Sequence, residues 1–218
     1  MYNEYIENKV ESEKKTACLI FLYLITGCSS SNSQQNNTPT QIINGCPPNQ
    51  LVIAKEGNVK YPEIDVVSAA SILQGEKLMV VIKLKNIPEK ITFNSPGAEN
   101  GSIEYVWGVD IDIDGNSATG NEGLSGCNGI DYILHAIALP KYGNPKTLPL
   151  SSVLEAIVGK FENNSFTTIS EATVQVSLVE KTIGLLGTIP GITTKSNLCF
   201  VTYKLIDLDS VQDVVGCQ

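Results

Sequence analysis

An acidic run at residues 110–116 is the part of the chain whose residue types could do chemistry. It reads Asp-Ile-Asp-Ile-Asp-Gly-Asn, so Asp110, Asp112 and Asp114 place three carboxylates within one short segment. Carboxylates this close repel one another unless a cation joins them. Alternate carboxylates on a turning loop, with backbone carbonyls between them, supply the hard oxygen ligands that Ca²⁺ takes, and the glycine permits a sharp turn. The run therefore predicts a calcium site.

The run is not a standard EF-hand loop. If Asp110 is position 1, the glycine falls at position 6 as required, but position 12 is Asn121, and Glu122 comes one residue too late. A closing ligand must therefore come from elsewhere, with Glu122 and Asp131 as candidates, and Asn116 adds a side-chain oxygen. The alternative is that these side chains are solvated turn formers, for which aspartate is a common choice.

The hydrophobic pattern around this run is typical of β-strands. Side chains alternate with period two in stretches rich in Val, Ile and Thr, which Gly, Pro and Asn interrupt at short intervals. We expect strands at residues 64–71, 77–85, 103–111, 130–139, 153–161, 165–169, 173–180 and 198–206. We also expect a hairpin turn at 162–165, a short helix beginning within 150–158, and a loop at 183–192. About eight antiparallel strands predict an all-β, jelly-roll-like β-sandwich.

Four cysteines lie in the part of the chain that carries these strands: Cys46, Cys127, Cys199 and Cys217. Outside the cytoplasm an even number of cysteines favours disulfides, and four cysteines allow three pairings. We expect Cys46 to pair with Cys217, clasping the two ends of the domain, and Cys127 with Cys199, although spacing alone leaves the other pairings open. Zinc is disfavoured, because there is no C-x-x-C pair and His135 is the only histidine.

Cys28 ends the sequence Leu-Ile-Thr-Gly-Cys, directly after an apolar stretch at residues 17–25 that follows two lysines. This arrangement resembles a bacterial lipoprotein signal. The resemblance implies that residues 1–27 are removed and that the Cys28 thiol carries a diacylglyceryl group, which anchors the protein to a bilayer. The apolar stretch, of about 9 residues, is too short for a transmembrane helix, which needs about 20. Ser29, in place of aspartate, implies the outer membrane in a bacterium that has two.

The segment after Cys28 has no apolar side chain up to residue 40. Residues 29–40 are only Ser, Asn, Gln, Thr and Pro, so residues 28–45 are expected to be a flexible tether and residues 46–218 the folded domain. After residue 27 the chain keeps 12 lysines against 19 acidic residues, a net charge of −7, and it has no arginine. This charge argues against nucleic acid, and the lack of guanidinium groups disfavours anionic ligands.

The central segment resembles a known group of secreted modules. The stretch 105–116, Thr119 with Gly120, and the Gly-Ile-Asp-Tyr sequence at 129–132 are similar to the core of family 9 carbohydrate-binding modules and the related DOMON domains. In that group a strand ends in an aspartate-rich loop that contains Thr-Gly, and the next strand opens with Gly-x-Asp-Tyr. The resemblance extends over residues 60–206 and is specific in about the central 30. It implies a β-sandwich with an extracytoplasmic binding role and no catalytic residue.

Two aromatic residues are candidates for stacking against a sugar ring, as carbohydrate-binding modules require. Trp107 alternates with Tyr105 and Val109 within an expected strand, which favours a place in the core. Tyr142, in the Pro-containing stretch 139–150, is the freer candidate. Glycans are therefore a weakly supported ligand class.

The sequence carries none of the common catalytic motifs. G-x-S-x-G, H-E-x-x-H and a P-loop are absent, and a single histidine restricts the available nucleophile and base pairs, so we expect no enzyme activity. Two functions remain: a calcium-stabilised binding module, with glycans as a ligand class, and a structural lipoprotein that docks another envelope protein. Exposed aromatic residues in a concavity would favour the first, and an apolar sheet face or an unpaired edge strand the second.

Overall fold

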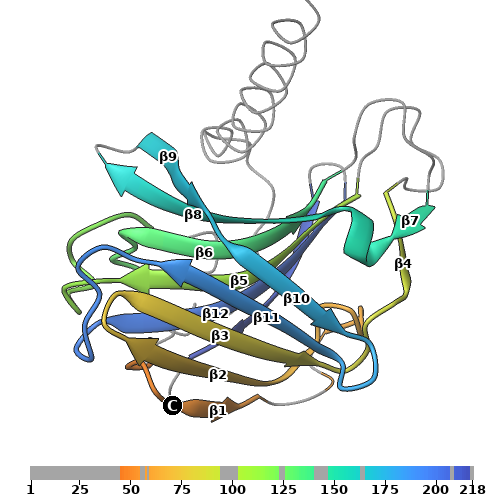
Figure 1. Cartoon of the computed structure of the whole chain (residues 1–218), viewed down its shortest axis with the longest axis horizontal. Helices are drawn as coiled ribbons and strands as arrows, with labels where there is room; N and C mark the ends of the chain where they lie inside the picture. Colours follow the sequence, from red (N-terminus) through yellow and green to blue (C-terminus); the bar gives the residue numbers. More distant parts are fainter. Residues whose placement is uncertain are drawn as a thin grey trace, which may run out of the picture.

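The computed structural model describes residues 45–54, 57, 59–93, 103–122, 126–139, 147–162, 165–206 and 209–216. Two antiparallel β-sheets pack face to face, so the predicted all-β sandwich is confirmed (Figure 1). The predicted signal, Cys28 and the tether lie outside the described residues. Among the described residues, no helix is long and apolar enough to cross a membrane.

The first sheet has five strands in the order β1-β2-β3-β11-β10. These are β1 (Leu51–Ile53), β2 (Val66–Gln74), β3 (Lys77–Leu84), β10 (Thr173–Ser177) and β11 (Thr182–Thr188). The second sheet has six strands in the order β13-β12-β5-β6-β8-β9. These are β5 (Ile103–Asp112), β6 (Tyr132–Ala138), β8 (Leu154–Glu162), β9 (Ser165–Glu171), β12 (Asn197–Ile206) and β13 (Asp209–Val215).

A two-stranded ribbon and one helical turn complete the described elements. The ribbon pairs β4 (Lys90–Thr92) with β7 (Thr147–Pro149), and a 3-10 turn, Leu150–Ser152, leads from β7 into β8. The expected short helix is therefore a single turn. The expected hairpin is present, since Glu162 pairs with Ser165 between β8 and β9.

The expected loop at residues 183–192 is wrong, because β11 occupies most of it and pairs with both β3 and β10. Its glycines indicated a turn, but Gly187 serves a close approach of the two sheets. A Cβ atom at Gly187 would lie 2.8 Å from side-chain atoms of Leu134 and Val158 on the facing sheet. Glycine is therefore required here by packing.

The core lies between the two sheets, and several buried polar groups at its margin are hydrogen-bonded. Residues of β3 alternate between exposed and buried, while every residue of β5 is buried. Asp213 of β13 accepts a hydrogen bond from the Val66 amide of β2 at 2.8 Å, and the Thr202 hydroxyl donates to the Ile64 carbonyl at 2.6 Å. The first bond joins β2 to β13 of the other sheet, and the second ties the segment just before β2 to β12; unpaired polar groups at these buried positions would be costly.

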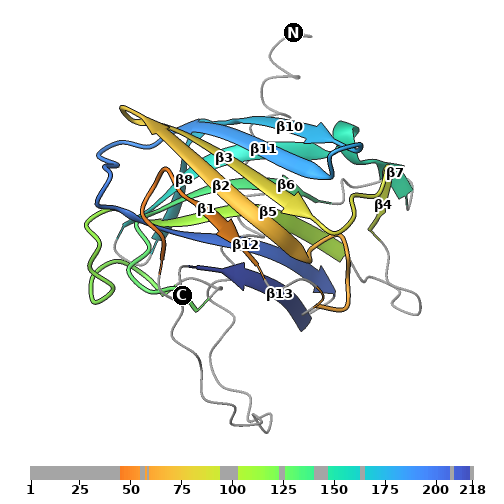
Figure 2. The ribbon, with the colours of Figure 1, turned by 90° about the horizontal axis from the view of Figure 1, so that it is seen from below.

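The acidic run lies at one end of the sandwich. The connection from β5 to β6 projects at that end, and the β4–β7 ribbon lies at the opposite end (Figures 1 and 2). Because β5 runs from one end to the other, its first and last residues belong to two separate surfaces.

Candidate metal centre

The loop that carries the acidic run is fixed at both of its ends. It leaves β5 after Asp112 and enters β6 at Tyr132, and Asn121 and Ile130 pair across it through two backbone hydrogen bonds of 3.0 and 2.9 Å. The disulfide between Cys127 and Cys199 ties the returning half of the loop to β12. These cross-links hold the returning half of the loop close to the end of β5.

Three of the predicted ligands meet at this end: Asp112, Asp114 and Asp131. Each offers a carboxylate oxygen, and these atoms all lie within 4.8 Å of one another. Oxygens that share one Ca²⁺ lie at most about 5 Å apart, since each is about 2.3–2.6 Å from the ion. The spacing of the three carboxylates therefore fits a common calcium ion.

Asp112 is the buried member of this cluster, with 3 % of its surface exposed. Its Oδ1 accepts hydrogen bonds from the Gly115 amide at 2.8 Å and from the Asn116 amide at 3.2 Å. Gly129 has φ +82°, and a Cβ atom there would lie 3.0 Å from Asp112 Oδ2. The absence of a side chain at Gly129 therefore allows the returning loop to lie directly against this carboxylate.

Asp114 is the exposed member and is oriented by its neighbours. Its Oδ1 accepts from the Asn116 amide at 2.9 Å, and the Thr119 hydroxyl donates to its Oδ2 at 3.0 Å. Asp131 lies opposite, half-buried, and its Oδ2 accepts from the Ile113 amide at 2.9 Å. Thr119 was not among the predicted site residues, although it belongs to the Thr-Gly element that carried the family resemblance.

Two carboxylates of the cluster have pKa values shifted in opposite directions. Burial raises the pKa of Asp112, and the adjacent Asp114 raises it further. Hydrogen bonds from the Asn116 amide and the Thr119 hydroxyl lower the pKa of Asp114. Asp114 is thus held as an anion beside a carboxyl group that resists ionisation, and a bound cation would remove that resistance.

Asp110 is not part of the cluster, although it was predicted as a ligand. It is 3 % exposed, and its Oδ1 lies 2.9 Å from Nε2 of His135, so this histidine is a hydrogen-bonded core residue. Glu122 is exposed and is not part of the cluster either. The side-chain Oδ1 of Asn116 accepts from the Ala118 amide at 3.2 Å, and so it stabilises the turn.

The aromatic and cysteine predictions have separate outcomes. Trp107 is 1 % exposed, stacks on Tyr105 and donates from Nε1 to the Glu63 carbonyl, so it is a core residue and offers no face to a ligand. Tyr142 lies outside the described residues.

The bond between Cys127 and Cys199 is confirmed. Cys46 is also disulfide-bonded, while its predicted partner, Cys217, lies outside the described residues.

No protein-family model matches the chain, and no curated protein matches its sequence.

Proposed function

We propose that the protein is an extracytoplasmic lipoprotein, anchored through Cys28, whose β-sandwich is a calcium-stabilised binding module. The observation that carries this proposal is the convergence of Asp112, Asp114 and Asp131, whose carboxylate oxygens lie within 4.8 Å of one another. In this proposal the ion joins the end of β5 to the start of β6, and so it stiffens the loop between them.

Thermal unfolding with and without calcium tests the metal site. Extracytoplasmic calcium modules bind with dissociation constants of about 10⁻⁴ to 10⁻³ M. At about 2 mM CaCl₂ such affinities stabilise the folded state by roughly 0.7 to 1.8 kcal/mol. We therefore expect the melting temperature to rise by about 1 to 7 °C relative to EDTA. An unchanged melting temperature would contradict the proposal.

A matched pair of variants shows whether the effect comes from this cluster. Asp114→Asn removes one exposed carboxylate of the cluster and should abolish the calcium response. Glu180→Gln removes an exposed carboxylate in the turn between β10 and β11, and it should keep the response. Equal calcium responses in the two variants would place the bound ion elsewhere.

The anchor is tested separately from the metal. Wild-type protein should take up radiolabelled palmitate in a bacterial host and should sediment with membranes. Cys28→Ala should lose both properties while keeping the calcium response of the folded domain. Membrane sedimentation of Cys28→Ala equal to wild type would argue against the anchor.

A second candidate function is docking to another envelope protein, and one observation favours it. Ile72, Met79 and Leu186 lie side by side on the outer face of the five-stranded sheet and are 51, 43 and 39 % exposed. At the edge of the same sheet, Leu51 and Ile53 of β1 are 67 and 70 % exposed. Contiguous exposed apolar surface beside an edge strand is typical of interaction sites.

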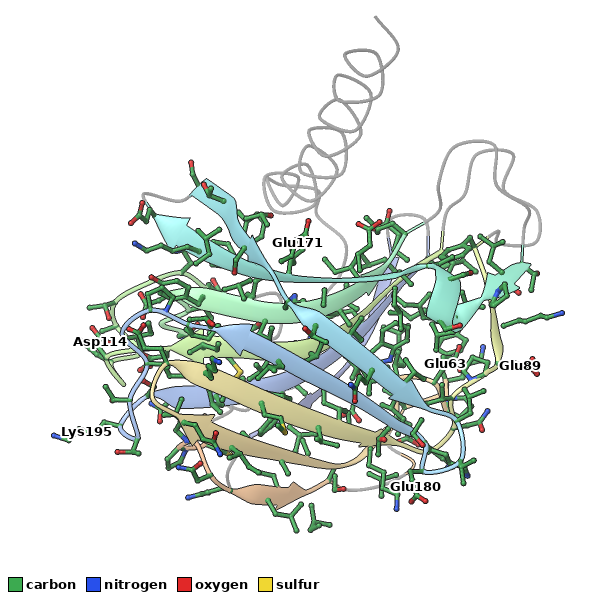
Figure 3. The ribbon with its side chains drawn as sticks, in the orientation of Figure 1. Glu63, Glu89, Asp114, Glu171, Glu180 and Lys195 are labelled. Atoms are coloured by element: carbon green, nitrogen blue, oxygen red, sulfur yellow. A yellow bond between two sulfur atoms is a disulfide. The ribbon has the colours of Figure 1, made fainter. Side chains whose placement is uncertain are left out.

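A photo-crosslinking amino acid tests docking in cells. Placed at position 79, it should give a discrete protein adduct, while the same group at position 195, on the exposed loop before β12, should give none (Figure 3). The same yield of adducts from both positions would argue against a docking face.

A further inference from the structure

A pocket of about 240 Å³ lies at the opposite end of the sandwich from the aspartate cluster. Figure 3 shows Glu63, one of its lining residues, at that end and Asp114 at the other. Tyr105 and Asp112 are seven residues apart on β5, so the two surfaces are separated by roughly 23 Å. The polar lining of the pocket comprises Glu63, Asn86, Lys90, Thr92, Tyr105 and Lys204.

Lys204, a residue of β12, is held among an anion and two aromatic rings. Its Nζ lies 2.7 Å from Glu63 Oε1, 3.9 Å from the centre of the Tyr61 ring and 5.2 Å from that of Tyr105. The side chains of Lys204 and Glu63 are only 9 and 15 % exposed. A buried pair of this kind stabilises a fold only weakly against an apolar alternative.

Side-chain contacts order the wall of the pocket. The rings of Tyr105 and Trp107 stack with centres 5.6 Å apart and planes 6° apart, and Trp107 Nε1 donates to the Glu63 carbonyl at 2.8 Å. Burial, followed by the charge of Glu63, raises the pKa of Tyr105, so its phenol keeps its proton. The pocket thus presents fixed donors and acceptors before any ligand binds.

We propose that this pocket binds a neutral polyhydroxyl ligand of about the size of one sugar ring. The pocket would be the ligand site of the binding module, and this assignment rests on that proposed function. A volume of 240 Å³ equals that of about eight water molecules, below the range of drug-sized sites. The sequence offers one signal for the pocket, since Lys204 is the only charged residue in the apolar stretch 198–206.

The charges of the wall select a neutral ligand. Lys204 and Glu63 already neutralise each other, so neither serves as the counter-ion of a charged ligand, and the further charge of the lining, Lys90, is exposed, where solvent screens it. A pair of neighbouring hydroxyl groups can bridge the two side chains, with one hydroxyl donating to Glu63 and the next accepting from Lys204. Asn86 and Thr92 supply further donors and acceptors at the exposed rim.

The test is an NMR titration of ¹⁵N-labelled full-length protein in detergent solution. The neutral probes are glucose, galactose and N-acetylglucosamine, and the charged probes are glycine, succinate and ethanolamine, each added up to 50 mM. At least one neutral probe should give saturable shifts at the amides of Asn86, Thr92 and Lys204. Tighter binding of a charged probe, or no shift at these amides from any probe, would overturn the proposal.

Two variants identify the contacts, and a third is the control. Tyr105→Phe removes one hydroxyl and keeps the ring stack, and Asn86→Ala removes an exposed amide; each should weaken binding by about 3- to 10-fold. Lys83→Ala, an exposed lysine on β3, should leave binding unchanged. Equal affinity in all three variants would overturn the pocket assignment.

A repeat of the titration in EDTA separates the pocket from the metal site. The pocket shifts should persist without calcium, because the cluster lies at the other end of the sandwich. A sugar that shifts only amides of the loop after β5 would support a glycan-binding module and overturn this pocket as its site. If the pocket shifts are present but calcium does not raise the melting temperature, the metal site is rejected and the pocket is not.

Discussion

The disulfide between Cys127 and Cys199 should contribute a large part of the stability of the domain. The two cysteines are 72 residues apart and are 1 and 4 % exposed. In the chain-entropy model, closing a loop of this length lowers the entropy of the unfolded chain and so stabilises the folded state by about 4.4 kcal/mol. A domain of this size loses roughly 2 to 4 °C of melting temperature per kcal/mol. The double variant Cys127→Ala/Cys199→Ala should therefore melt about 9 to 18 °C below wild type.

Substitution is the appropriate perturbation, because a reducing agent would also act on the disulfide of Cys46. The assay is differential scanning calorimetry of the two proteins at the same calcium concentration. A second pair, Cys127→Val/Cys199→Val, fills more of the vacated volume and controls for packing; it should also lose stability. If either pair melts within about 3 °C of wild type, the cross-link does not restrict the unfolded chain as reasoned.

Three further substitutions give separate tests. Asp112→Asn should abolish the calcium response without lowering the melting temperature in EDTA, because burial already raises the pKa of Asp112 and disfavours its charge. Burial also raises the pKa of Glu104, so its ionisation opposes folding, and stability from this group is lost as pH rises above the ordinary value of 4.5. Glu104→Gln should therefore melt above wild type at pH 7, and the difference should vanish at about pH 4. Asp213→Ala leaves the buried Val66 amide unpaired and should lower the free energy of unfolding in urea by about 1 to 3 kcal/mol, while Asp213→Asn, which keeps an acceptor, should lower it less.

The strands that alternate clearly were predictable from the sequence. The expected stretches at 77–85 and 103–111 differ from β3 and β5 by one residue at one end. β13, with the sequence Asp-Ser-Val-Gln-Asp-Val-Val, was missed, because its buried Asp213 breaks the apolar pattern. β11 was missed because its glycines match a loop in sequence, and only the facing sheet shows that Gly187 serves packing.

The candidate site was predictable where neighbours in sequence are neighbours in space. Asp112 and Asp114 follow from the acidic run, and Asp131 from the start of the next strand, which must return beside the first. Asp110 has the same residue type and spacing, but its contact with His135 depends on how β5 and β6 pair. The pair of Lys204 and Glu63 joins residues 141 positions apart, so no local pattern could indicate it.

Isothermal titration calorimetry with CaCl₂ tests the central claim most directly. For wild-type protein we predict saturable binding of one Ca²⁺ per chain at the Asp112, Asp114 and Asp131 cluster, with a dissociation constant of about 10⁻³ M or tighter. Asp131→Asn should remove this binding while the protein remains folded. No saturable binding to the wild type, or the same binding to Asp131→Asn, would contradict the claim that these aspartates form a calcium site.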